Sequence, residues 1–140
     1  MKRPEKISKL LSANDTGESG GHQAGMLVPK DNGVLPFFPA LDSSEYNPRC
    51  HLFFVDAAGE RWEFAFIYYN NRFFNGTRNE YRLTRMTKYF RQYGLQTGDE
   101  VFLTRTPDDD FSISHRRKNQ PEITSDGVLR LAAGWKIIEI

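Results

Sequence analysis

The stretch RWEFAFIYY, residues 61–69, constrains the fold of this chain more than any other segment. Aromatic residues occupy every second position as far as Tyr68, and Arg61 and Glu63 lie between them. A period of two residues is typical of a half-buried β-strand, because successive side chains of a strand point to opposite faces of its sheet. A second β-rich run, HLFFVD, precedes it, and AAGE between the two runs contains a glycine suited to a tight turn. The sequence therefore predicts a β-hairpin over residues 51–69.

Other short runs predict the rest of the architecture. EVFLTR and FSISH flank TPDDD, whose proline and aspartates favour a turn, so we expect a second hairpin over residues 100–115. Residues 127–140, GVLRLAAGWKIIEI, predict one or two more strands. A helix of at most about three turns is predicted over residues 84–94, and a short helix or turn over residues 31–41, where two prolines exclude a long helix. Many short strands with two short helices indicate a mainly β fold, a small barrel or sandwich.

The size and composition of the chain indicate one soluble domain. With 140 residues, of which 39% are hydrophobic, residues 1–140 have apolar material for a single core. Cys50 is the only cysteine, which excludes an internal disulfide and favours a reducing, intracellular environment. The N-terminal residues hold no apolar stretch of signal-peptide length, so we expect no membrane partner.

Charge is distributed unevenly along the chain, although the formal net charge is only +1. Residues 68–93 carry six basic side chains and the single acid Glu80, whereas residues 97–110 carry five acids and the single basic residue Arg105. The net charge gives no argument for a polyanionic partner. The basic segment fits a DNA contact and equally fits a solvated face whose charges pair with acids elsewhere.

The residues that common catalytic motifs require do not occur at the required spacing. No Asp-x-Lys or Glu-x-Lys is present, so the chain lacks the usual carboxylate and lysine arrangement of a metal-dependent nuclease. His22, His51 and His115 lie far apart and form no zinc motif. The sequence thus predicts no catalytic residue, no metal site and no cofactor, and binding is the remaining class of function.

Two polar segments carry the residue types that read double-stranded DNA. In the major groove, Arg or Lys binds guanine, Asn or Gln binds adenine, and a carboxylate accepts from the cytosine amine. Residues 12–25, SANDTGESGGHQAG, offer these groups on a glycine-rich segment, and residues 70–83, expected to form a loop or ribbon, offer them beside basic side chains. Glycines allow a backbone to approach base edges or phosphates closely. Taken singly, each residue also fits an ordinary polar loop.

Residues 11–30, LSANDTGESGGHQAGMLVPK, together with residues 67–85, IYYNNRFFNGTRNEYRLTR, resemble the N-terminal effector domain of EcoRII-type restriction endonucleases. The segments VDAAGERWEF and LQTGDEVFLTR are more loosely similar to plant transcription-factor domains of the B-three type. The two resemblances cover roughly residues 8–115. They imply a DNA-binding pseudobarrel of about seven strands, from which an N-arm and a C-arm grip the major groove.

The resemblance also implies the residues that contact DNA. In the N-arm these are Lys9, Ser12, Asn14, Asp15, Thr16, His22 and Gln23. In the C-arm they are Arg78, Asn79, Glu80, Tyr81 and Arg82, with Arg72 and Arg85 nearby. Arg78 and Arg82 are expected to read guanines, and Glu80 or Asp15 to accept from a cytosine amine. Lys9, Arg72 and Arg85 are expected to hold phosphates.

The same resemblance implies a role within a larger protein. Such a domain binds a second copy of the target, CC(A/T)GG in the type IIE relative, and regulates a separate nuclease domain, expected here beyond residue 140, which alone would need Mg²⁺. The isolated domain is expected to be monomeric. The sequence departs from the family pattern at Asn75 and Gly76, where glycine and lysine are expected, and at Tyr81, where a second lysine is expected.

Two other classes of function stay open. A single-stranded nucleic-acid binder would stack bases on exposed aromatics, for which Tyr69, Phe73, Phe74 and Tyr81 are the candidates. A protein-interaction domain on the same fold would use the acidic turn at residues 107–110 as its contact.

Overall fold

The computed structural model describes residues 3–17, 25–118, 128–130 and 134–138, and these residues form one curled β-sheet with short helices around it. Its strands are β1 Lys6–Leu10, β2 Met26–Val28, β3 Arg49–Val55, β4 Arg61–Tyr69, β5 Glu80–Thr84, β6 Glu100–Arg105, β7 Phe111–Arg116, β8 Val128–Arg130 and β9 Trp135–Ile138. The order across the sheet is β2-β5-β4-β3-β7-β6-β1-β9-β8. The resemblance implied about seven strands, and these ranges contain nine.

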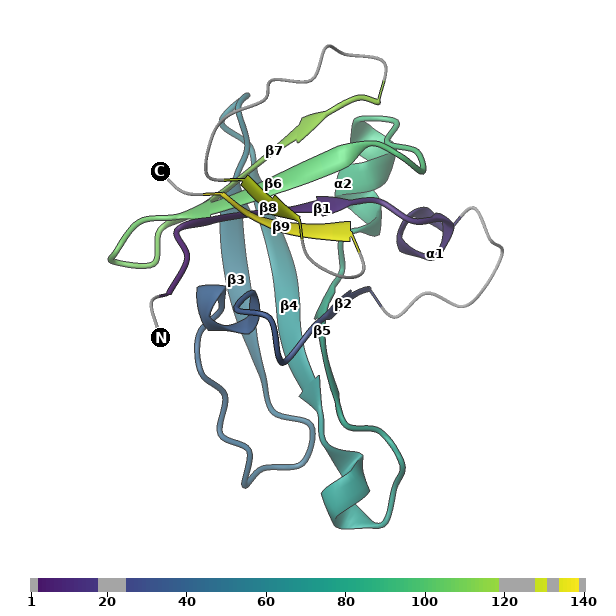
Figure 1. The fold of residues 1–140 in the computed structure, drawn as a ribbon, viewed down its shortest axis with the longest axis vertical. Helices are drawn as coiled ribbons and strands as arrows, with labels where there is room; N and C mark the ends of the chain where they lie inside the picture. Colours follow the sequence, from purple (N-terminus) through teal and green to yellow (C-terminus); the bar gives the residue numbers. More distant parts are fainter. Residues whose placement is uncertain (1–2, 18–24, 119–127, 131–133, 139–140) are drawn as a thin grey trace.

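Both predicted hairpins are present. β3 and β4 pair antiparallel from Arg49 opposite Ile67 to Val55 opposite Arg61, and β6 and β7 pair antiparallel on either side of the TPDDD turn. The two hairpins join through a short parallel contact in which Phe54 lies opposite Phe111. In Figure 1 the strands β3, β4 and β5 run along the length of the molecule, and β1, β6, β7 and β9 cross them at its upper end. This crossing folds the single sheet over its own core.

The core lies between the crossing parts of the sheet and is largely aromatic. Phe64 and Phe66 are at most 1% exposed, as the alternation in residues 61–69 predicts, and Phe54 on β3 is fully buried beside them. Ala65 and Ile67 point to the other face of β4 but are buried as well, at 1% and 4% exposure. They lie beside the long side chains of the neighbouring strands β3 and β5, so both faces of β4 are covered at this point.

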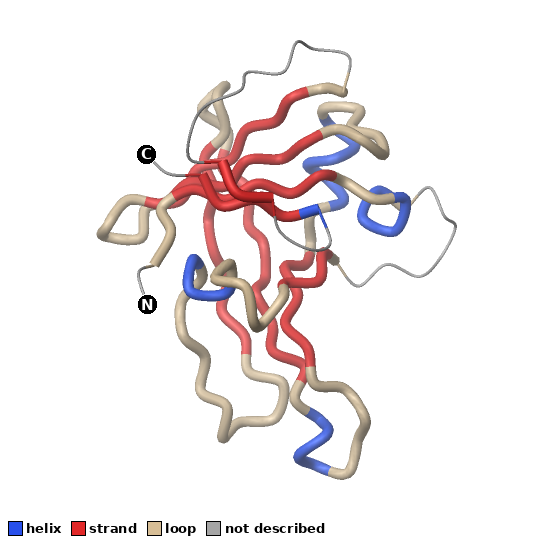
Figure 2. Tube along the Cα trace, viewed as in Figure 1, coloured by secondary structure: helices blue, strands red, loops and turns tan. Residues whose placement is uncertain are grey.

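The last two strands extend the sheet beyond β1, in agreement with the one or two strands predicted for residues 127–140. β9 pairs with β1, and β8 pairs with β9 (Figure 2). Trp135 is fully buried, and its indole Nε1 donates a hydrogen bond of 3.1 Å to the carbonyl oxygen of Leu27 on β2. One side chain thus links β9 to β2, two strands that do not pair with each other in the sheet order.

The helices are short. α2 spans Thr87–Gln92 within the predicted 84–94, and the 3-10 helix η1 spans Leu35–Phe37 within the predicted 31–41. A one-turn helix α1, Ala13–Thr16, and a 3-10 helix η2, Asn71–Phe74, lie in the two segments expected to be loops. In the part of the chain that the structure describes, no helix is long and apolar enough to cross a bilayer.

The expectation that residues 70–83 form a loop or ribbon outside the core is wrong in its second half. From Glu80 onward the chain is strand β5, which lies between β2 and β4, and Leu83 is fully buried. A strand with neighbours on both sides packs one of its faces against the core. In β5 this face is formed by Tyr81 and Leu83.

Asp56 fixes the turn between β3 and β4. Its carboxylate accepts hydrogen bonds from the backbone amides of Ala58 and Glu60 and from the indole of Trp62, and the hydroxyl of Tyr93 donates to it as well. Desolvation raises the pKa of Asp56, but these four donors outweigh it and hold the pKa below the ordinary value of 3.8. The contribution of this cluster to stability is therefore present above that pH and is lost as the pH falls further.

A second buried carboxylate joins four strands on the opposite part of the sheet. Glu100 on β6 is 1% exposed. It accepts from the hydroxyl of Ser8 on β1 at 2.7 Å and from the ammonium of Lys136 on β9 at 3.0 Å, and it pairs with Arg116 on β7. Desolvation raises its pKa, and these partners lower it by more, so the net pKa lies below the ordinary value.

Candidate nucleic-acid interface

Strand β5 places three predicted DNA contacts in a row. Side chains two residues apart in a strand share a face, so Glu80 and Arg82 point away from the core, and Arg78 precedes the strand in the same register. Tyr69 on β4 lies opposite Glu80, and Ile67 lies opposite Arg82. We refer to Arg78, Glu80 and Arg82 as the β5 stripe. The structure thus brings these three residues of the predicted C-arm together on one outer face of the sheet.

Arg78 is held from two directions. Its Nε and Nη2 each lie 2.9 Å from Oε1 of Glu80, and its guanidinium carbon lies 3.9 Å from the centre of the Tyr69 ring. Stacking on an aromatic ring orients the plane of a guanidinium, and the carboxylate fixes its rotation within that plane. The side chain of Arg78 is still 37% exposed. It is therefore both oriented and accessible.

Arg82 is more enclosed. Its Nη1 donates to the carbonyl oxygen of Gly25 at 3.0 Å and its Nη2 to Oε2 of Glu80 at 3.3 Å. Its Nε is buried and finds no hydrogen-bond acceptor within the part of the chain that the structure describes, and the side chain is 24% exposed. Both terminal nitrogens of Arg82 thus already bind acceptors within the protein.

Glu80 lies between the two arginines and uses one carboxylate oxygen for each. Partial burial raises the pKa of its carboxyl group, and the hydrogen bonds and charges of Arg78 and Arg82 outweigh burial, so the net pKa is lowered. The carboxylate is therefore ionised at neutral pH. To accept from a cytosine amine, as predicted, it would have to share an oxygen with an arginine or release one.

Asn79 and Tyr81 pack against the same tyrosine. The hydroxyl of Tyr68 donates to Oδ1 of Asn79 at 2.6 Å, and the rings of Tyr68 and Tyr81 stack with their centres 4.1 Å apart. Burial raises the pKa of Tyr81 above its ordinary value, and Tyr68 adds to this rise. The predicted contact residue Tyr81 thus faces the core side of β5, and Asn79 keeps its amide nitrogen for an outside acceptor.

The other basic residues predicted for phosphate contacts lie at the two ends of the β5 stripe. Arg72 on η2 is exposed, and its backbone amide donates to the carbonyl of Arg78 at 2.9 Å, which places it beside the stripe. Arg85, at the other end, is 58% exposed and lies 3.7 Å from Glu63. Both side chains are accessible, as a phosphate contact requires.

The departures from the family pattern fit together locally. Asn75 has a positive φ of 70°, which asparagine tolerates better than most residues. Asn71 Oδ1 accepts from the backbone amide of Arg78 at 2.7 Å, and a Cβ on Gly76 would lie 2.5 Å from this same oxygen. A lysine at position 76 would therefore displace Asn71. Glycine in place of the expected lysine therefore lets Asn71 hold the backbone amide of Arg78.

In the N-arm segment, the predicted loop begins with the helix α1. The hydroxyl of Ser12 accepts from the amide of Asp15, and the carboxylate of Asp15 accepts from the amide of Ser12, which is a capping box. Thr16 closes the turn with weak hydrogen bonds of 3.4 Å to two backbone carbonyls. Asn14 is exposed on this turn. The predicted contacts His22 and Gln23 lie outside the described residues.

Lys9 and Asp15 do not occupy the positions expected of DNA contacts. They are each 5% exposed, and the ammonium of Lys9 lies 2.8 Å from Oδ2 of Asp15. Lys9 lies two residues from each of the core residues Ile7 and Leu11, so its side chain shares their inward-pointing face. The placement contradicts the expectation that Lys9 presents its charge to phosphates and that Asp15 presents its carboxylate to a base. The pair attaches α1 to β1 instead.

Gly25 links the two predicted arms. Met26, the next residue, pairs with Leu83 on β5, and the carbonyl of Gly25 binds Arg82. Gly25 has a φ of +87°, and a Cβ there would lie 2.3 Å from the carbonyl oxygen of Leu83. Only glycine fits this approach without movement of β5.

Replacing Gly25 by alanine is therefore expected to lower the free energy of unfolding by about 1–3 kcal/mol, because the added methyl group overlaps the backbone of β5. Urea denaturation followed by tryptophan fluorescence measures the change. Gly59→Ala is the matched control: this glycine has a φ of +85° but no heavy atom within 4 Å of a Cβ. Equal losses in the two variants would mean that the positive φ alone, and not the close approach, accounts for the effect.

Three residues near the site were not predicted to support it. Lys30 follows β2 and donates to the backbone carbonyl of Asn79 at 3.1 Å. Tyr68 and Tyr69 hold Asn79 and Arg78 as described above. A basic residue after a strand is a weak signal. Tyr68 was expected to pack in the core and Tyr69 was considered only as a ring on which a base could stack, so neither supporting role could be found from a short-range pattern.

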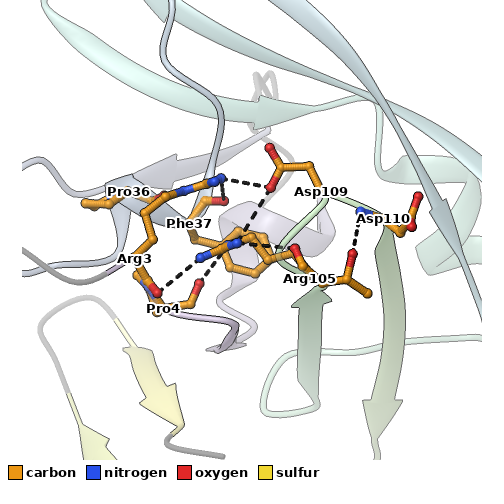
Figure 3. Close-up of polar contacts among 8 residues, drawn as sticks. Arg3, Pro4, Pro36, Phe37, Arg105, Asp109 and Asp110 are labelled. Carbon is orange, nitrogen blue, oxygen red and sulfur yellow. Dashed lines mark hydrogen bonds and ion pairs between the residues drawn. The ribbon is translucent and has the colours of Figure 1, made fainter.

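The acidic turn that could serve a protein partner is partly neutralised. Asp109 lies 3.1 Å from Arg3 and 3.7 Å from Arg105, and Arg3 also donates to the backbone carbonyls of Pro36 and Phe37 (Figure 3). The amide of Asp110 donates to the hydroxyl of Thr106 within the turn. These contacts fasten the segment before β1 to η1 and the β6–β7 turn.

Comparison with known proteins gives consistent results. The family model described as "Restriction endonuclease EcoRII, N-terminal" matches residues 5–113. The type II restriction enzyme EcoRII of Escherichia coli is 43% identical over 83 residues, which cover 55% of this chain and 20% of that protein. Among solved structures, the Arabidopsis FUS3–DNA complex is similar, with a TM-score of 0.59 and 22% identity over 79% of this chain and 94% of that chain.

These matches confirm the mainly β pseudobarrel that the sequence predicted. The chain spans about a fifth of the length of the E. coli relative, and the part of that family it matches is the N-terminal one. Because the family model covers most of the chain, from residue 5 to residue 113, the chain belongs to the family of EcoRII-type N-terminal domains.

Proposed function

We propose that this domain binds double-stranded DNA in a sequence-specific manner through the β5 stripe. The observation that carries the proposal is the oriented and exposed guanidinium of Arg78, fixed by Glu80 and Tyr69. A bidentate arginine is the commonest reader of guanine in the major groove, and it reads best when its plane is fixed in advance. Arg72 and Arg85 flank the stripe and supply charge for phosphates.

Family membership supports DNA binding as part of a restriction enzyme. The matching family model is that of the N-terminal part of the enzyme, and this supports the prediction that the nuclease is a separate part of the protein. No group of three His, Cys, Asp or Glu side chains suited to a metal ion occurs among the described residues.

The finer features of the function rest on the resemblance in sequence. We infer that the domain acts as the effector domain of a type IIE enzyme in the bacterial or archaeal cytoplasm, that its target is CC(A/T)GG or a related site read in the major groove, and that a separate Mg²⁺-dependent nuclease domain belongs to the same protein. The domain by itself needs no cofactor and is monomeric.

Selection from a random pool of duplexes, followed by sequencing of the bound fraction, tests the proposal. Recovery of one short consensus is the expected result, and the consensus CC(A/T)GG would support the target inferred from the resemblance. Competition with each single strand of the recovered site belongs to the same experiment. Recovery of no consensus, with tight binding to single strands, would instead support the single-stranded reading.

Binding of single-stranded nucleic acid is supported by only two of the four candidate aromatic residues. Tyr69 is covered by Arg78 and Tyr81 by Tyr68, so these two rings are not available for stacking with bases. Phe73 and Phe74 on η2 are 65% and 43% exposed, beside Arg72. They are the aromatics on which a single strand would stack.

Arg78→Ala is expected to weaken cognate binding by about 1–3 kcal/mol and to relax preference at one base pair, as loss of a bidentate contact does. Electrophoretic or fluorescence titrations with the cognate duplex and with each single base-pair change measure this. Arg91→Ala, an exposed arginine on α2, is the control for charge alone. An unchanged ratio of cognate to changed-site affinity in Arg78→Ala would contradict the base-reading role.

A further inference from the structure

The sequence pattern treats Arg78 and Arg82 as equivalent readers, but the structure gives them different surroundings. Arg78 keeps a 37% exposed side chain and lies over an aromatic ring. Arg82 has one buried nitrogen with no acceptor among the described residues, and its other two nitrogens bind Gly25 and Glu80. A guanine contact needs two parallel N–H groups of one guanidinium facing the base. Arg82, at 24% exposure and tied to a backbone carbonyl as well as to Glu80, is less able than Arg78 to turn such a pair toward a base.

The contacts form a continuous chain across three strands. The carbonyl of Gly25, at the start of β2, accepts from Arg82; Arg82 donates to Oε2 of Glu80; and Oε1 of Glu80 accepts from Arg78. The ring of Tyr69 on β4 covers the last guanidinium. Each group therefore limits the rotation of the next one, from a fixed backbone atom to an exposed side chain.

The order of these contacts determines how far each side chain can rotate. Glu80 is restrained on both sides, because a carboxylate with one arginine on each oxygen cannot turn without losing a charged hydrogen bond. If Arg82 is removed, Oε2 loses its partner and Glu80 is free to turn about its side-chain bonds. Arg78 would then keep its attraction to Glu80 but lose its fixed direction.

We propose that Arg82 is a positioning residue, which orients Arg78 through Glu80, and that Arg78 is the reader of the β5 stripe. This inference rests on the proposed function for its consequence in DNA recognition. Its physical content, a restraint on Arg78 that originates at Gly25, exists in the protein without DNA and is measurable there.

The first measurement uses the protein alone. The Nε–H of Arg78, which donates to Glu80, is expected to give a protected cross-peak in a ¹H–¹⁵N NMR spectrum near neutral pH. In Arg82→Met this peak is expected to shift and to broaden or disappear through faster exchange with water. Arg61→Met is the matched control, because the guanidinium of Arg61 lies 4.4 Å from the ring of Phe53 and Arg61 begins β4, at the opposite end of that strand from Tyr69. An unchanged Arg78 peak in Arg82→Met overturns the proposal.

The second measurement uses DNA. Arg82→Met is expected to lower discrimination by about tenfold at the same base pair as Arg78→Ala. The double variant should discriminate there no worse than Arg78→Ala alone, because the two residues act in series. Relaxation at a different base pair, with additive losses in the double variant, would make Arg82 a reader and overturn the proposal.

Arg82→Lys serves if Arg82→Met is poorly folded. Lysine keeps the charge, but its single ammonium cannot replace two separate guanidinium nitrogens, so the same loss at the Arg78 base pair is expected. Wild-type discrimination together with a wild-type Arg78 peak in Arg82→Lys would also overturn the proposal. If the unaltered domain selects no duplex sequence while the Arg78 peak responds to Arg82→Met, the proposed function fails and the restraint on Arg78 stands.

Discussion

Replacing Glu100 by alanine is expected to lower the free energy of unfolding by about 3–5 kcal/mol, because breaking a buried ion pair by removing one partner is strongly destabilising. Lys136 is 6% exposed, and its ammonium lies 3.0 Å from the Glu100 carboxylate. The variant also removes the acceptor for Ser8 and the partner of Arg116. Chemical denaturation, with unchanged slope against denaturant, measures the loss.

Asp108→Ala is the matched control for Glu100→Ala, since Asp108 is an exposed acid on the turn that follows the same strand. Surface substitutions of this kind usually change stability by less than about 0.5 kcal/mol. The variant Glu100→Gln separates charge from shape, because glutamine keeps the volume and an acceptor oxygen. If Glu100→Ala were no more destabilising than Asp108→Ala, the network on this part of the sheet would contribute nothing to stability.

Replacing Lys9 by alanine is expected to be similarly destabilising, by about 3–5 kcal/mol, because it leaves the carboxylate of Asp15 buried without its cation. The sequence alone predicted a different outcome, a loss of DNA affinity for all sequences and a smaller salt dependence. The two expectations differ in what is measured: the first appears in unfolding without DNA, and the second appears in the salt dependence of binding.

The double variant Lys9→Met/Asp15→Ala distinguishes the two roles of Lys9. It removes both charges, so it should recover part of the stability that Lys9→Ala loses. Lys6→Ala is the control, since Lys6 lies on β1 with its ammonium 5.3 Å from the ring of Phe102. If Lys9→Ala were as stable as the wild type and its DNA affinity depended less on salt concentration, Lys9 would be a phosphate contact and the role of the buried pair would be contradicted.

Much of the fold could be predicted because its signals are local. The alternation in residues 61–69, the TPDDD turn and the glycine between β3 and β4 determine two hairpins regardless of the rest of the chain. β1 could have been recognised in part, since Ile7 and Leu11 fall on one face of an extended segment. A lysine in the middle of that pattern obscures the apolar face, and only the position of Asp15 in space explains why it is tolerated.

The residues of the candidate site could be predicted from the sequence, but the separate role of each residue could not. TRNEYR supplies the residues of the β5 stripe, and strand alternation then separates Arg78, Glu80 and Arg82 from Tyr81. The capping box of Ser12 and Asp15 is a recognisable sequence signal for α1 that the glycine-rich context concealed. That Arg82 binds Gly25, 57 residues away, depends on the pairing of β2 with β5, which no short-range pattern specifies.

The hydrogen bond from Trp135 to Leu27 means that the limit of the family match and the limit of the cooperative folding unit differ. The match ends at residue 113, yet Trp135 touches the strand residue opposite Arg82. A fragment cut at the homology boundary would keep every predicted DNA contact and lose the strand that braces them. Domain swaps between relatives should therefore exchange β8 and β9 together with the arms, because specificity carried by one segment depends on the rigidity supplied by another.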